Sequence, residues 1–165
     1  MTNIFNSIKD VDDQLSLIEQ QIKLKRMSDN EAWLKAGGIL DNFFTAFGSF
    51  VKNVEDNENR IKKVKSAFDY IHKKWFLRSS FMSRSFYKPC GYPGDYILLE
   101  RIYVNKPMGI GIDRIMDRFA LNRPGAKSIR MRKSLAIRLL KKAVYKNSFA
   151  NGRINIIDVG AGSGR

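Results

Sequence analysis

Four residues near the end of the sequence have types and a spacing that suit the binding of a nucleotide-like cofactor. They form the run Asp158-x-Gly160-x-Gly162-x-Gly164, which begins near the end of the apolar segment Ile154–Val159. Glycine has no Cβ, so ligand atoms can lie directly against the backbone of such a loop. An acid two residues before the first glycine can orient an ammonium group of the ligand, directly or through water.

The same run narrows the choice of cofactor. A phosphate-binding P-loop would need a Lys-Ser/Thr pair after its last glycine, and none is present. A dinucleotide fingerprint would need a glycine where Arg165 stands. S-adenosylmethionine (SAM) carries no phosphate and needs no lysine. We therefore predict SAM as the cofactor, and the alternative is a turn without a ligand. The predicted cofactor-binding residues are Asp158, Gly160, Ala161, Gly162 and Gly164.

A second candidate for chemistry is the segment from Lys88 to Asp95. Two prolines and two glycines in it exclude a regular element and favour a stiff loop. We predict Tyr92 and Asp95 as catalytic residues, and Lys88 and Tyr92 as contacts to the substrate. The alternative is a structural corner in which Asp95 only caps the following helix, at about residues 96–104.

A third candidate is a basic region with no acidic residue, from position 118 to position 157. Within it, Arg130 and Arg132 could bind a substrate carboxylate through paired hydrogen bonds. The region at 118–153 could equally hold a nucleic-acid backbone. It contributes strongly to the net charge of +14.

Helices must position most of these residues. Apolar residues at alternating steps of four and three predict a helix over residues 2–26, which packs on its neighbours or pairs with a second copy in a homodimer. Ser28 and Glu31 have the spacing of a capping box, which predicts the start of a second helix. A third helix to about Leu77, a short helix at 112–120 and a long one from Pro124 to about Lys146 follow from the same periodicity.

These elements predict a mainly α chain of two parts. Residues 1–122 form a helical substrate or cap domain, and residues 123–165 begin a Rossmann-like α/β domain with Ile154–Val159 as its first strand. The length of 165 residues suits one domain and a piece of a second.

Composition excludes several other classes of protein. Cys90 is the single cysteine, so no internal disulfide can form, and one cysteine with one histidine cannot make an ordinary zinc site. No apolar run approaches the roughly 20 residues of a membrane helix. We expect a cytoplasmic protein.

Three segments together resemble a known family. Residues 154–164 resemble motif I of class I SAM-dependent methyltransferases. The element Lys88-Pro-x-Gly-Tyr-x-Gly-Asp95 and the helix with Ala126, Arg130 and Arg132 resemble a bacterial type within that class, the extracellular-factor or 3-hydroxypalmitic acid methyl ester biosynthesis methyltransferases. The resemblance implies methyl transfer from SAM to a small-molecule acceptor, with an acyl or other carboxylate as the candidate.

The family continues past motif I with further strands that complete the cofactor pocket. We therefore expect this sequence to correspond to the N-terminal part of such an enzyme and to be inactive by itself. The alternative that the sequence leaves open is a basic helical module that binds nucleic acid or protein without catalysis.

Overall fold

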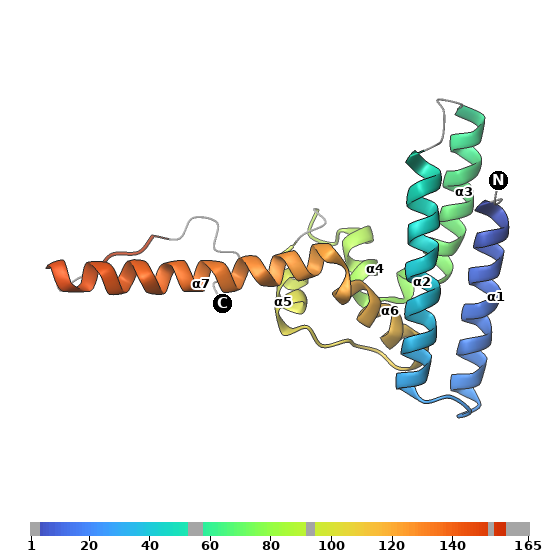
Figure 1. Cartoon of the computed structure of the whole chain (residues 1–165), viewed down its shortest axis with the longest axis horizontal. Helices are drawn as coiled ribbons and strands as arrows, with labels where there is room; N and C mark the ends of the chain where they lie inside the picture. Colours follow the sequence, from blue (N-terminus) through green and yellow to red (C-terminus); the bar gives the residue numbers. More distant parts are fainter. Residues whose placement is uncertain (1–3, 53–57, 92–94, 152–153, 158–165) are drawn as a thin grey trace.

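The computed structural model describes residues 4–52, 58–91, 95–151 and 154–157 (Figure 1). Every regular element within these ranges is a helix. In chain order they are α1 (Ile4–Lys23), α2 (Asp29–Lys52), α3 (Glu58–Lys74), the 3-10 helix η1 (Phe76–Arg78), α4 (Ser80–Tyr87), α5 (Tyr96–Val104), α6 (Gly111–Asn122) and α7 (Pro124–Asn151).

The main core lies where α1, α2 and α3 run side by side and meet η1 and α6 (Figure 1). The apolar seam predicted for the first helix is confirmed, since its inner positions from Ile8 to Ile18 are buried. Phenylalanine rings from α2, η1 and α6 fill the centre, where Phe76 lies 5.3 Å from Phe44 and 6.4 Å from Phe119 between ring centroids. The most deeply buried residues include Leu15, Leu40, Ile71, Trp75, Phe76 and Met116.

The start of α2 shows how local sequence places an element. Ser28 and Glu31 form the predicted capping box: the Ser28 amide donates to Glu31 Oε2 at 2.9 Å, and the Glu31 amide donates to Ser28 Oγ at 3.3 Å. Both donors would otherwise lack a partner at the first turn of a helix.

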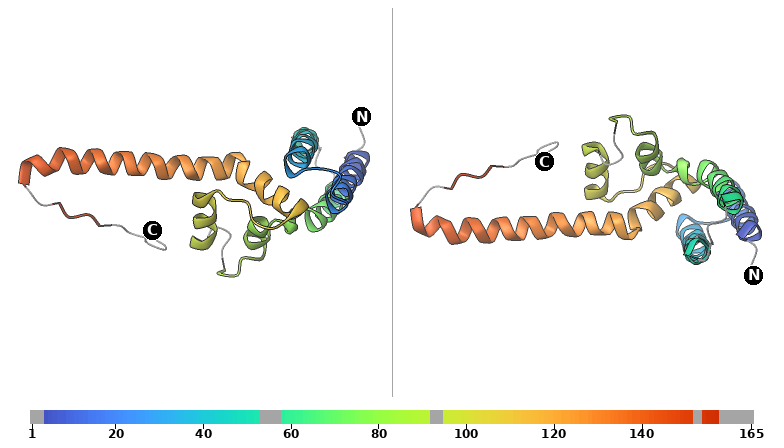
Figure 2. Two further views of the ribbon diagram at one scale, coloured as in Figure 1. Left: turned by 90° about the horizontal axis from the view of Figure 1, so that it is seen from below. Right: turned by 90° about the horizontal axis from the view of Figure 1, so that it is seen from above.

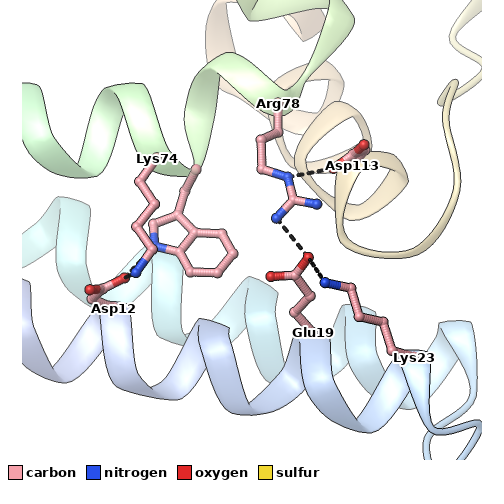
Figure 3. Close-up of polar contacts among 7 residues, drawn as sticks. Asp12, Glu19, Lys23, Lys74, Arg78 and Asp113 are labelled. Atoms are coloured by element: carbon pink, nitrogen blue, oxygen red, sulfur yellow. Dashed lines mark hydrogen bonds and ion pairs between the residues drawn. The ribbon is translucent and has the colours of Figure 1, made fainter.

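Charged side chains in the bundle are paired across helices. Asp12 on α1 accepts from the amine of Lys74 at 2.6 Å and from the indole of Trp75 at 2.8 Å. Arg78 bridges Glu19 on α1 and Asp113 on α6, at 2.9 and 2.6 Å (Figure 3). These contacts fix the order in which α1, α3, η1 and α6 meet.

A buried carboxylate joins α4, α6 and the segment between α5 and α6. Asp117 on α6 accepts from Ser79 Oγ at 2.6 Å, from the amide of Phe81 at 3.2 Å and from the amide of Met108 at 2.9 Å. Ser79 also caps α4, because its hydroxyl accepts from the amide of Met82. The position of α4 therefore depends on a residue 37 positions or so further along the chain, in α6.

One residue separates α6 from α7. Arg123 is extended, with φ −67° and ψ 152°, and Pro124 starts the new helix. The Arg123 guanidinium lies over the rings of Phe44 and Phe119, and its Nη1 is 2.8 Å from Asp41 Oδ1. These contacts tie the start of α7 to α2 and α6.

The first turns of α7 pack on α5 and α6. Ala126 and Ile129 join Ile102 of α5 and Leu121 of α6 in a second apolar cluster. From position 131 to position 147 every residue of α7 is exposed. The helix extends away from the bundle, as all three views show (Figures 1 and 2).

The predicted α/β part is wrong for the described residues. No strand occurs within them, and residues 154–157 have no regular secondary structure, with Ile156 61% and Ile157 88% exposed. A strand needs a neighbour to pair its backbone groups, and this segment has none among the described residues. The regular elements of the described residues are thus all helices, and these residues do not form the start of a Rossmann-like sheet. Residues 158 and 159 of the predicted strand lie outside the described ranges. The division at 122/123 stays a prediction.

Candidate functional site

Asp95 is the predicted site residue that the structure places most firmly. It is 1% exposed and caps α5, because its Oδ1 accepts from the amide of Leu98 at 2.8 Å. The predicted role as a helix cap is confirmed. The Arg84 guanidinium on α4 meets both carboxylate oxygens, with Nη2 2.7 Å from Oδ2 and Nε 3.0 Å from Oδ1.

This pairing sets the protonation state of Asp95. The Arg84 guanidinium holds the pKa of Asp95 below its ordinary range, and the donor amide of Leu98 acts in the same direction. The group is therefore a carboxylate at neutral pH, and its lone pairs face Arg84 and the first turn of α5. Its geometry suits holding the preceding turn against α4 and α5.

Lys88 begins that turn. It ends α4 in the left-handed conformation, with φ 48°, and its carbonyl accepts from the amide of Gly91 at 2.8 Å. Gly91 has φ 83°, which a glycine adopts without the steric cost of a Cβ. The side chain of Lys88 is exposed. The predicted irregular loop is confirmed for residues 88–91, whereas Tyr92 lies outside the described residues.

Arg84 and Cys90 are neighbours of this site that the sequence did not reveal. Arg84 Nη2 is 3.4 Å from Cys90 Sγ, so one guanidinium contacts both Asp95 and the thiol. Arg84 sits in α4, a helix absent from the sequence predictions. It lies 11 residues before Asp95, beyond the reach of local helix or cap patterns, so the pair becomes evident only in the fold.

Arg130 and Arg132 project from different sides of α7, since residues two apart on a helix do not face each other. Arg130 is half-buried and donates through Nη2 to the carbonyl of Leu121, at 3.0 Å. Its Nη1 is buried without a partner among the described residues. Arg132 is exposed. The structure does not bring the two guanidinium groups together on one ligand, and each remains a separate candidate contact.

Helix α5 contacts both helices that carry candidate site residues next to it, α4 and α7. Arg101 on α5 donates to the backbone carbonyl and hydroxyl of Ser80 on α4, both at 3.1 Å. The Tyr103 ring on α5 lies under the amine of Lys133 on α7, 4.3 Å from its centroid. Helix α5 therefore connects the Lys88–Asp95 turn with the basic helix. The predicted cofactor residues Asp158, Gly160, Ala161, Gly162 and Gly164 lie outside the described residues.

The part of the chain that the structure describes shows neither a metal site nor a membrane-spanning helix. It holds no group of three or more His, Cys, Asp or Glu side chains that could bind a metal ion. None of its helices has the length and apolar character needed to cross a bilayer.

Comparison with known proteins gives one match. Residues 91–165 match the model of a family described as "Putative methyltransferase". The matched range includes Asp95, both α7 arginines and the glycine run. No curated protein and no solved structure matched. The family match supports a methyltransferase, that is, an enzyme whose general chemistry is methyl transfer.

Proposed function

We propose that the protein transfers a methyl group from SAM to a carboxylate acceptor. The observation that carries the proposal is the methyltransferase match over residues 91–165, within which the run Asp158 to Gly164 has the spacing of a SAM loop. In this proposal the three glycines and Ala161 lie against the cofactor. Asp158 orients its ammonium group.

The reaction is a displacement at carbon. An acceptor oxygen forms a bond to the methyl carbon while the bond from that carbon to the sulfonium sulfur breaks. The electron pair of the broken bond stays on sulfur, and S-adenosylhomocysteine leaves as a neutral thioether. The protein must hold acceptor, methyl and sulfur in line at near-attack distance, and this alignment is a large part of such catalysis.

The state of Asp95 supports a carboxylate acceptor. A hydroxyl or ammonium acceptor would have to lose a proton, whereas a carboxylate is already ionised at neutral pH. Asp95 is ion-paired with Arg84 and engaged as a helix cap, so it suits a positioning role better than proton transfer. We assign it to holding the turn that carries Tyr92. Tyr92 and Lys88 are the proposed contacts to cofactor and acceptor, with Arg130 or Arg132 for the acceptor carboxylate.

The choice of SAM as cofactor is tested by calorimetry, in which SAM is titrated into the protein that carries this whole sequence. Gly162→Arg fills the space against the backbone and is expected to abolish binding. Gly38→Arg adds the same charge on α2, where a Cβ would meet nothing within 4 Å, and should leave binding unchanged. Equal binding by the wild type and Gly162→Arg, or no binding by the wild type, would contradict the proposal.

The chemical class of the methyl acceptor is identified from the alkali stability of the methylated product. With SAM labelled in its methyl group, a methyl ester releases volatile methanol on treatment with alkali, whereas methylated amines and ethers keep the label. Transfer of alkali-stable label to the acceptor would refute the carboxylate and leave SAM-dependent methyl transfer intact.

A further inference from the structure

Helix α7 has an inner side that the structure identifies by its contacts. Ile129 packs on the cluster of Ile102 and Leu121, and the Lys133 amine lies over the Tyr103 ring. Residues three and four apart share one side of a helix. The inner side therefore continues through Ala136 and along the exposed part of the helix, where it is apolar. Its further members are Leu140, Ala143 and Val144.

Most cations of α7 lie on the other side, which also carries the exposed apolar side chains of Met131, Leu135 and Tyr145. At 3.6 residues per turn, five of its eight lysines and arginines project from the half of the helix that faces away from α5. We call this set the outer stripe. All five side chains are exposed, and none makes an ion pair with a described residue. The outer stripe consists of Lys127, Arg138, Lys141, Lys142 and Lys146.

We propose that the outer stripe binds the phosphate backbone of a nucleic acid. From Lys127 to Lys146 the helix rises about 28 Å, at about 1.5 Å per residue. A duplex presents about 16 phosphate charges over that length, at about one per 1.7 Å. A row of cations with no acid among them matches such a row of anions, and this binding does not depend on the cofactor. The recognition is of the backbone and not of the base sequence.

Two other occupants fit this surface less well. A helix that lies in a membrane surface buries its apolar side and keeps its cations beside that side at the headgroups. In α7 exposed apolar residues such as Met131 and Tyr145 lie among the cations of the outer stripe, so the helix lacks the single apolar side that such a position needs. A second copy of α7 would bring together two helices that are both cationic and free of acids, and these would repel each other.

Fluorescence anisotropy with a labelled 20-base-pair RNA duplex, and with a DNA duplex of the same length, tests the proposal. The wild type should bind both, with an affinity that falls steeply as salt rises. The double variant Arg138→Gln/Lys141→Gln removes two stripe charges. We expect at least a fivefold rise in Kd and a log–log salt slope shallower by about 1.8, from about 0.9 per phosphate contact.

The double variant Arg132→Gln/Lys133→Gln is the matched control. It removes one arginine and one lysine from the same helix, but from outside the outer stripe, and its Kd should stay within twofold of the wild type. Glutamine has nearly the same helix propensity, and circular dichroism verifies that both variants fold. Equal losses in the two variants would overturn the proposal, because they would indicate attraction by net charge alone. Binding to phosphatidylserine vesicles without binding to either duplex would also overturn it, as would no binding to either duplex.

Discussion

Two regions of the molecule differ in the burial and pairing of their side chains. They are the bundle of α1, α2 and α3 and the exposed part of α7. In the bundle, apolar residues are buried and charges such as Asp12 and Arg78 are paired across helices. In α7 beyond Arg130, apolar residues such as Leu140 are exposed, and the cations have no ionic partner among the described residues. The bundle thus pairs or buries its own side chains, while the side chains of α7 from position 131 to position 147 are exposed.

A large-to-small change in the bundle core should have the largest effect. Phe76 is fully buried against Phe44 and Phe119, so Phe76→Ala removes its contacts and leaves a cavity. We expect the free energy of unfolding to fall by about 3–5 kcal/mol. Urea denaturation followed by circular dichroism measures it. A loss below about 1 kcal/mol would mean that this region is not the stabilising core.

The next effect should come from Asp117, which joins α4 and α6 to the segment before α6. Asp117→Asn keeps the shape but turns an amide donor toward groups that are themselves donors. We expect a loss of about 2–3 kcal/mol, because buried donors are left without acceptors. Asp69→Asn, at an exposed position of α3, is the matched control and should cost less than about 0.5 kcal/mol. Similar losses in both variants would refute the role of Asp117.

Acid should weaken the bundle through Asp12. Burial raises the pKa of Asp12, but hydrogen bonds from Lys74, Tyr70 and Trp75 outweigh burial and leave that pKa below its ordinary value. A carboxyl whose pKa is lower in the folded state stabilises the fold above the unfolded pKa, about 3.9, and this contribution is lost as pH falls through the folded pKa. Asp12→Asn should therefore cost on the order of 1–2 kcal/mol at pH 7 and little at pH 2.

Urea denaturation at pH 7, 4 and 2 compares Asp12→Asn with the wild type. The two stabilities should converge as pH falls. A difference that stays constant over this range would show that the Asp12 contacts do not depend on its charge.

The smallest effect should come from the exposed part of α7. Leu140→Ala removes a side chain that is already half exposed and replaces it with the best helix former. We expect a change within about 0.5 kcal/mol. A loss of 2 kcal/mol or more in the free energy of unfolding, from the same urea experiment, would contradict the contrast between the bundle and α7. It would show that Leu140 is buried in solution.

Several helices could be predicted from the sequence because their signals are local. The α1 seam, the capping box at Ser28 and the cap at Asp95 all act within a few residues, and all are observed. Helix α4 was not predicted because Ser79 is held by Asp117, and no local pattern encodes a contact of that sequence separation. The prediction of a strand from Ile154 was wrong in the described residues for a related reason. An apolar run specifies burial, and the pairing of a strand comes from partners elsewhere.

Contacts between residues far apart in the sequence also limited how much of the candidate site could be predicted. The cap role of Asp95 followed from its place before an apolar helix, whereas its ion pair with Arg84 depends on how α4 and α5 meet. Arg130 and Arg132 are close in sequence, yet the helix turns them apart. The binding of a carboxylate by Arg130 or Arg132 stays a prediction, and helical geometry indicates that each would act separately.

Arg123 has a mechanical consequence beyond its local contacts. With Pro124 it forms a one-residue elbow, and α7 is a lever about 42 Å long, from 28 residues at about 1.5 Å each. A change of about 10° at the elbow would move the far end by about 7 Å, which exceeds one helical turn of about 5.4 Å. The direction of α7 therefore depends in part on the contacts of the Arg123 guanidinium with Phe44, Phe119 and Asp41, beside the packing of Ala126 and Ile129 on α5 and α6.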